Sequence, residues 1–156
     1  MNVISNFAAR YERTREEEIS LEDYLEICKN DKSAYATAAE RMLDAIGEPQ
    51  MVDTRNDPRL SRIFANKVIK IYPAFEEFYG MEEAIEQVVS YFRHAAPGLE
   101  EKKQILHLLG PVGGGKSSIA ERLKQLAEKV PFYAIKGSPV NESPLGLFDP
   151  AEDGPI

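Results

Sequence analysis

Eight consecutive residues of this chain could bind phosphate through their backbone. They read Gly110, Pro111, Val112, Gly113, Gly114, Gly115, Lys116 and Ser117, which fits the pattern G-x-x-x-x-G-K-[ST]. The three central glycines allow positive φ angles and carry no side chain that would block a ligand. Their amides can therefore point inward and form a concavity that binds anions.

The residues that end this glycine loop bring charge and a metal ligand. Lys116 supplies an ammonium to the β and γ phosphates of a nucleotide, and the Ser117 hydroxyl is placed to ligate Mg²⁺. Ser118 follows as a contact near the α phosphate. A helix that starts here would add its free amides and the positive end of its dipole. The pattern predicts a site for a nucleoside triphosphate with Mg²⁺.

The flanking residues predict the elements that such a loop needs. Residues 104–109 form a short apolar run, typical of a buried parallel strand. After the loop, apolar residues recur at helical spacing as far as Val130, and Pro131 closes the helix. Residues 132–135 predict a second strand. Strand, loop and helix thus occur in the order that a phosphate-binding loop requires.

Nucleotide hydrolysis needs a further carboxylate, at the end of another strand, that holds magnesium or orients water. Glu121 and Glu128 lie on the predicted loop helix and are expected to face solvent. Residues 145–149 end in Asp149, but Gly146 weakens a strand there, so we do not assign Asp149 this role. We therefore predict that the chain binds nucleotide without completing a catalytic site.

Two amphipathic helices precede this region. Ser20 and Asp23 form a capping pattern, and the apolar face that follows ends at Cys28. A second helical face runs from Tyr35 to Ile46, with capping residues at 30–33 before it. We predict a helical hairpin within an N-terminal helical subdomain over residues 1–58, and an earlier helix carrying Phe7 and Tyr11 on one side.

Residues 59–156 are predicted to form the nucleotide-binding domain. A loop over residues 48–62 leads into a helical turn and a short strand at 68–71. A helix follows from Met81 to Ala95, and Pro97 with Gly98 stops it. The predicted fold class is α/β, with a helical N-terminal subdomain followed by an incomplete P-loop core.

Composition excludes several classes of function. The net charge is −7, and no basic stripe is present, so nucleic-acid binding is not expected. No apolar run approaches the roughly 20 residues that span a bilayer, so no membrane association is expected. Cys28 is the sole cysteine, which suits a reducing cytoplasm.

With these motifs in view, the chain resembles the N-terminal part of the PrkA-type serine protein kinase family. The resemblance rests on residues 31–36, 39–43, 45–49, 72–81 and 108–118. It implies an AAA+-type module that binds ATP, with Tyr79, Gly80 and Met81 lining the adenine pocket. It also implies kinase activity on a protein substrate for the full-length protein. Members of the family are several hundred residues long, so we expect this chain to be a truncated form without phosphotransfer of its own.

Two other functions stay open at this point. One is an AAA+-type ATPase that remodels proteins or supports proteolysis, and the other is a non-enzymatic fragment that acts as an interaction module. The two predicted core strands, at 104–109 and 132–135, would leave sheet edges and apolar helix faces uncovered. Self-association of the chain is therefore expected.

Overall fold

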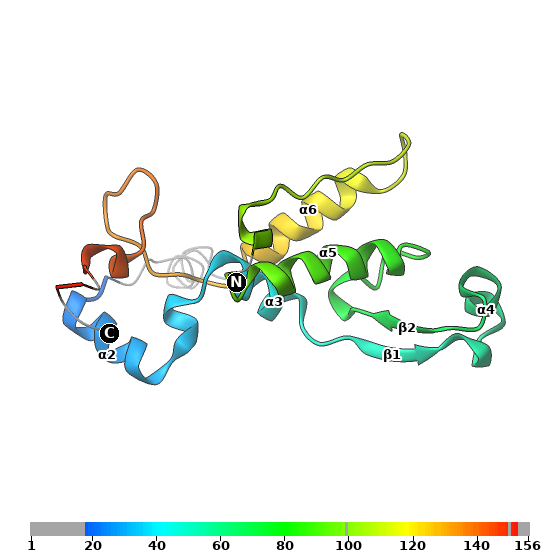
Figure 1. The fold of residues 1–156 in the computed structure, drawn as a ribbon, viewed down its shortest axis with the longest axis horizontal. Coiled ribbons are helices and arrows are strands. Elements are labelled where there is room, and N and C mark those ends of the chain that lie inside the picture. Colours follow the sequence, from blue (N-terminus) through cyan, green and yellow to red (C-terminus); the bar gives the residue numbers. More distant parts are fainter. Residues whose placement is uncertain (1–17, 99, 150, 153–156) are drawn as a thin grey trace, which may run out of the picture.

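The computed structural model describes residues 18–98, 100–149 and 151–152, so the predicted helix with Phe7 and Tyr11 lies outside the described residues. Figure 1 shows the arrangement of the elements. The α-helices are α2 (Leu21–Asn30), α3 (Ala38–Ile46), α4 (Pro58–Phe64), α5 (Glu82–Ala95) and α6 (Lys116–Ala127), and the strands are β1 (Gln50–Asp53) and β2 (Val68–Ile71). Short 3-10 helices η1 (Lys32–Tyr35), η2 (Thr54–Asn56), η3 (Pro73–Phe75), η4 (Glu100–Lys103) and η5 (Pro144–Leu147) connect them. None of the described helices is long and apolar enough to cross a bilayer.

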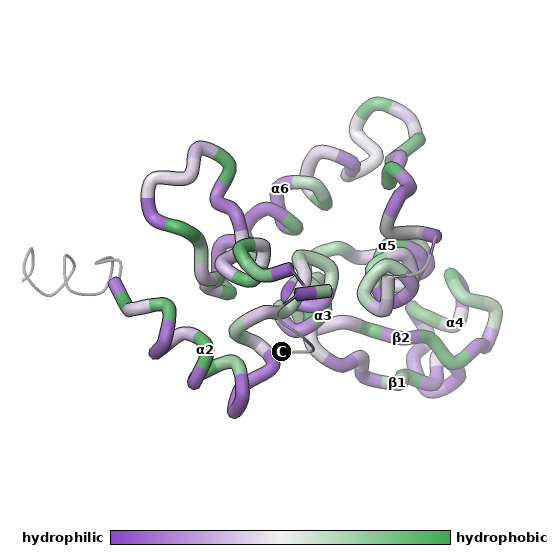
Figure 2. The backbone as a smooth tube through the Cα atoms, turned by 60° about the vertical axis from the view of Figure 1, so that its left-hand side comes forward, coloured by the Kyte–Doolittle hydropathy of each residue, from purple (hydrophilic) through white to green (hydrophobic). Residues whose placement is uncertain are grey.

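The first two described helices begin at side-chain caps. The Ser20 hydroxyl accepts the amide of Asp23 at 3.1 Å, which confirms the predicted start of α2. Figure 2 shows hydrophobic and hydrophilic segments alternating along α2. The second helix begins later than predicted, because Thr37 and Glu40 cap each other's backbone amides. Gly47, with φ of +77°, ends α3.

The core joins α3 to elements much later in the chain. Its buried side chains form one cluster: Ile46, Tyr72, Phe75, Ile85, Val89 and Leu126. They come from α3, the turn at η3, α5 and α6. Since α3 packs against α5 and α6, the structure does not set α2 and α3 apart as a hairpin packed on itself. The division of the chain at residue 58 stays a prediction.

An arm formed by β1, η2, α4 and β2 projects from the helical body (Figure 1). Its strands are antiparallel, with Gln50 opposite Ile71 and Asp53 opposite Val68. Thr54 is fully buried, and its hydroxyl donates to the carbonyl oxygen of Lys67 at 2.7 Å. The strand at 68–71 is confirmed. The prediction that residues 50–53 are loop was wrong. They pair in register with β2, and the hydrogen bond from Thr54 to Lys67 joins the ends of the two strands.

The two strands predicted beside the glycine loop are absent from the described structure. Residues 104–109 are extended but lie in no sheet, and the side chains of Ile105 and Leu109 are 85% and 87% exposed. Residues 132–135 are not a strand either, and the Tyr133 ring instead packs on Tyr24 with 5.2 Å between centroids. An extended segment becomes a strand only when a neighbour takes up its backbone hydrogen bonds. Within the described residues β1 and β2 form the one sheet, so the mixed helix and strand character holds, while the predicted parallel core does not form.

Candidate functional site

The glycine loop is a tight turn at the head of α6. The amide of Gly114 donates to the carbonyl oxygen of Pro111 at 3.1 Å, which closes the turn. Gly113 and Gly115 have φ angles of +81° and +75°, values that side-chain-bearing residues rarely adopt. The Val112 side chain at the tip is fully exposed. The backbone of the loop thus requires glycine at two of its three central positions.

Lys116 is the first residue of α6, and its side chain folds back over the loop. The ammonium Nζ donates to the carbonyl oxygen of Gly110 at 2.7 Å and also to that of Pro111. These two carbonyls hold a half-buried positive charge against the concave side of the loop. A phosphate oxygen near the loop could accept the hydrogen bonds that these carbonyls now accept.

The N-terminus of α6 offers unused backbone donors. The first hydrogen bond of the helix runs from the amide of Ile119 to the carbonyl oxygen of Gly115, at 2.9 Å. The amides of Lys116, Ser117 and Ser118 precede it, so the helix does not use them. Both serines are exposed. Their amides lie at the positive end of the helix dipole, where anions are stabilised.

Met81 brings the predicted adenine segment to the loop. A β-carbon on Gly115 would lie 2.8 Å from the Met81 sulfur Sδ and 3.1 Å from its methyl carbon Cε. Gly80 has φ of +76°, and its amide donates to Glu82 Oε1 at 3.3 Å. Tyr79 is 86% exposed. Of the three residues predicted for adenine, the structure places Met81 against the loop and leaves Tyr79 open to solvent.

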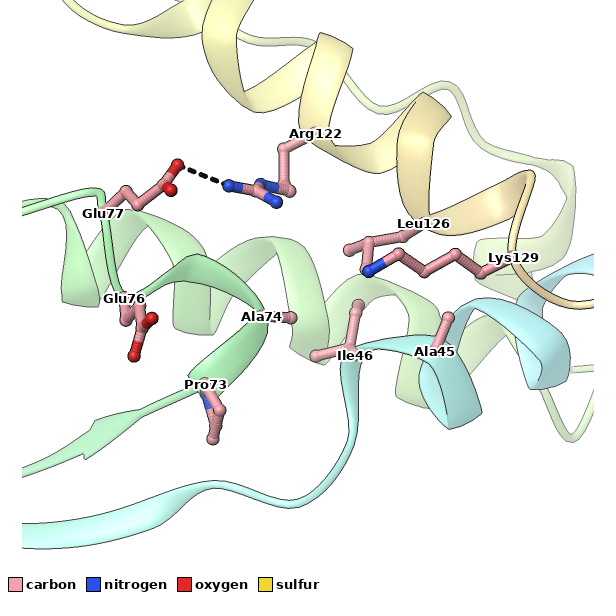
Figure 3. Close-up of a pocket in the computed structure, with 9 residues that line it drawn as sticks. All are labelled: Ala45, Ile46, Pro73, Ala74, Glu76, Glu77, Arg122, Leu126 and Lys129. Atoms are coloured by element: carbon pink, nitrogen blue, oxygen red, sulfur yellow. Dashed lines mark hydrogen bonds and ion pairs between the residues drawn. The ribbon is translucent and has the colours of Figure 1, made fainter. Parts of the chain in front are cut away.

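An ion pair that the sequence did not predict joins α6 to the segment before Tyr79. Arg122 on α6 donates through its guanidinium to Glu77 Oε2 at 2.5 Å (Figure 3). The pair lies at a cavity of about 310 Å³ between α3, η3 and α6, whose floor includes Ile46, Ala74 and Leu126. The two residues are 45 positions apart in sequence, and no pattern in the sequence links them.

The oxygen ligands available at the loop fit a magnesium ion that binds together with a nucleotide. Among the described residues, no group of three or more His, Cys, Asp or Glu side chains is placed to hold a metal. The Ser117 hydroxyl is exposed beside the loop, and Mg²⁺ commonly takes one or two protein ligands plus phosphate oxygens and water. The turn itself is tight at Gly114, because a β-carbon there would lie 3.1 Å from the Pro111 carbonyl oxygen.

Comparison with known proteins gives matches over nearly the whole chain. The family model described as the PrkA AAA domain matches residues 19–156. Serine/threonine kinase YeaG of Escherichia coli strain K12 is 62% identical over 160 residues, which cover all of this chain and 25% of that protein. ATP-dependent protease PrkA of Bacillus subtilis strain 168 is 35% identical over 152 residues, covering 89% of this chain and 22% of that protein. The chain thus spans about a quarter of the length of these curated relatives. No solved structure matches.

Proposed function

Because the chain belongs to the PrkA AAA-domain family, we propose that it binds ATP in the loop at the head of α6. The observation that carries the proposal is Lys116, whose ammonium lies over the concave side of a glycine turn at a helix N-terminus. A lysine, free amides and a helix dipole at one point form a phosphate site. The names of the relatives, a kinase and an ATP-dependent protease, support ATP as the nucleotide.

The phosphates are held by backbone and side chain together. Residues 110–115 wrap them, and the positive φ angles of Gly113 and Gly115 give the loop its turn. Lys116 exchanges the carbonyls of Gly110 and Pro111 for oxygens of the β and γ phosphates. The amides of Ser117 and Ser118 complete the contacts toward the α phosphate. The exchange replaces neutral acceptors by charged ones, which make stronger hydrogen bonds.

The Ser117 hydroxyl would hold Mg²⁺ that binds with the nucleotide, and the ion would supply positive charge to neutralise the phosphates. The base lies toward the segment formed by Tyr79, Gly80 and Met81. Met81 supports this placement because it touches Gly115, and the exposed Tyr79 ring is free to stack on a purine.

For the whole protein we propose phosphoryl transfer from ATP to a serine of a protein substrate. The proposal rests on the relative named as a serine/threonine kinase, which is 62% identical to this chain. The relative named as an ATP-dependent protease favours the alternative, an AAA+-type ATPase that acts on other proteins without phosphorylating them. Full-length protein incubated with γ-labelled ATP separates the two, because a kinase yields labelled phosphoserine and the alternative yields inorganic phosphate alone.

Titration calorimetry of this chain with ATP, with and without Mg²⁺, tests the nucleotide site. Lys116→Ala should weaken ATP binding on the order of 10- to 100-fold, the value of a hydrogen-bonded charge. Ser117→Ala should abolish the gain in affinity that Mg²⁺ gives the unmodified chain. Lys124→Ala, on the same helix and exposed, is the matched control and should bind as the unmodified chain does.

Equal ATP affinity in Lys116→Ala and the unmodified chain would contradict the proposed site. It would favour a non-enzymatic fragment that acts as an interaction module.

A further inference from the structure

We propose that the ion pair between Arg122 and Glu77 positions the base-binding segment relative to the phosphate loop. The proposal rests on the ATP site proposed above and assigns it two further residues. Arg122 lies on α6, six positions after Lys116, and Glu77 lies two positions before Tyr79. Both act on the nucleotide through the segment from Glu77 to Met81, so they are positioning residues.

The segment from Glu77 to Met81 is attached to α6 and its loop at both ends. At one end the Glu77 carboxylate accepts from the Arg122 guanidinium. At the other end Met81 packs on Gly115, close enough that a β-carbon there would make its thioether shift. Tyr79 and Gly80 lie between these two attachments, and the Tyr79 side chain is 86% exposed. The residues proposed to contact adenine are therefore on a short span fixed to the element that holds the phosphates.

The backbone of the span transmits the position of Glu77 to Met81. It consists of consecutive tight turns, in which the amide of Phe78 donates to Phe75 at 3.0 Å and that of Met81 to Phe78 at 3.4 Å. Phe75 is anchored in the core, and the Phe78 ring packs edge-on against it at 5.8 Å. A turn fixed at both ends limits how far Tyr79 can move relative to α6.

The charges around the pair single out Glu77 as the partner of Arg122. Glu76 and Lys129 also line the cavity, but Figure 3 shows the Glu76 carboxylate directed away from Arg122. The Arg122 side chain is 23% exposed, whereas that of Glu77 is 73% exposed. A partly exposed pair of this kind contributes modestly, so its removal should change affinity by a small factor.

The test compares ATP with inorganic tripolyphosphate, which has the phosphates but no base. Glu77→Gln and Arg122→Gln should each weaken ATP binding about two- to fivefold, the range that a surface ion pair supplies. Tripolyphosphate affinity should stay unchanged in both variants, because the phosphate loop is intact. A variant whose loss is only structural would weaken both ligands alike.

The matched controls change neighbouring charged residues that form no ion pair among the described residues. Glu76→Gln stands next to Glu77, and Lys124→Gln stands on the same helix as Arg122. Both should leave the ratio of ATP to tripolyphosphate affinity as it is in the unmodified chain. The exchanged variant Glu77→Arg with Arg122→Glu should recover most of the lost ATP affinity, since it restores the pair with reversed polarity.

Unchanged ATP affinity in both single variants, with normal ATP binding by the unmodified chain, would overturn the inference. Equal losses for ATP and tripolyphosphate would overturn it as well. If the unmodified chain binds neither ligand, or if Lys116→Ala has no effect, the proposed nucleotide site itself fails. The two failures are therefore distinguishable in one set of titrations.

Discussion

The sulfur of Met81 lies so near the backbone of Gly115 that a β-carbon on that glycine would be 2.8 Å from it. Contacts of that kind do not occur between real β-carbons and their neighbours without a shift of one of them. Gly115 is thus required for its φ of +75°, and a β-carbon there would also make the flexible Met81 thioether shift. The phosphate loop and the base segment meet at this point.

Gly115→Ala should therefore be more damaging than Gly113→Ala. Both glycines have positive φ, so alanine costs about 1–2 kcal/mol of backbone strain at either position. Gly113 has no atom within 4 Å of the added carbon, whereas Gly115 meets Met81. The thioether is the far end of a flexible side chain and can turn aside, so the added loss at Gly115 should be at most about 1 kcal/mol, the low end of overpacking costs. Urea unfolding of the two variants measures the difference.

A second substitution isolates the Met81 contact. In a chain that already carries Met81→Ala, the extra cost of Gly115→Ala over Gly113→Ala should disappear, because the thioether is gone. If the excess cost persists in the Met81→Ala background, the packing explanation is wrong, and the loss arises from the backbone alone.

Alkaline pH should destabilise the chain through Tyr24. This side chain is 2% exposed, and burial raises the pKa of its hydroxyl to about 12, with the neighbouring Cys28 thiol acting in the same direction. In the unfolded chain the pKa is about 10. The stabilisation is complete below pH about 10 and is lost as pH rises toward about 12, because the unfolded state then binds fewer protons. The loss amounts to about 3 kcal/mol.

Unfolding free energies at about pH 9 and about pH 11.5 test this dependence, when the unmodified chain is compared with Tyr24→Phe. All other side chains are the same in both proteins, so their contributions cancel in the comparison. The difference between the two proteins should therefore shift in favour of Tyr24→Phe at the higher pH. A difference that does not change with pH would exclude Tyr24 as the source.

The exposed residues of the 104–109 segment should drive self-association. Ile105 and Leu109 are 85% and 87% exposed, and each would gain about 1.5–3 kcal/mol if buried against another molecule. Ile105→Lys with Leu109→Lys should weaken association at least about tenfold, as measured by sedimentation velocity over a range of concentrations. Val140→Lys is the control, since Val140 is 71% exposed on a separate loop. An equal effect of the control would show that net charge, and not this segment, governs association.

Local signals in the sequence predicted the parts of the fold that depend on neighbours in the chain. Ser20 caps α2 as predicted, Gly47 ends α3, and the strand at 68–71 forms. The position of the loop at the start of a helix also follows from residues within a few positions of one another. Capping, helical spacing and glycine φ angles all depend on residues a few positions apart, so they can be predicted from the sequence.

The rest of the fold and the ion pair depend on contacts with distant residues, which sequence patterns do not identify. Residues 104–109 have the composition of a buried strand, yet a strand forms only where a neighbour lies alongside. Residues 50–53 have the composition of a loop because Pro49 precedes them and Asp53 is among them, and they become a strand through pairing with 68–71. The pair between Arg122 and Glu77 joins charges that each look like ordinary surface residues. In all three cases the structure depends on contacts between residues that are far apart in the sequence.

The core cluster has a consequence for synthesis on the ribosome. Ile46 is buried against Leu126, which is 80 positions later in the chain. At roughly 5–20 residues per second, translation leaves Ile46 without that neighbour for about 4–16 seconds. During this interval the apolar face of α3 is exposed and can contact other parts of the nascent chain or other molecules in the cell. The glycine loop, whose Lys116 is ten positions before Leu126, emerges just before the helix that completes the core.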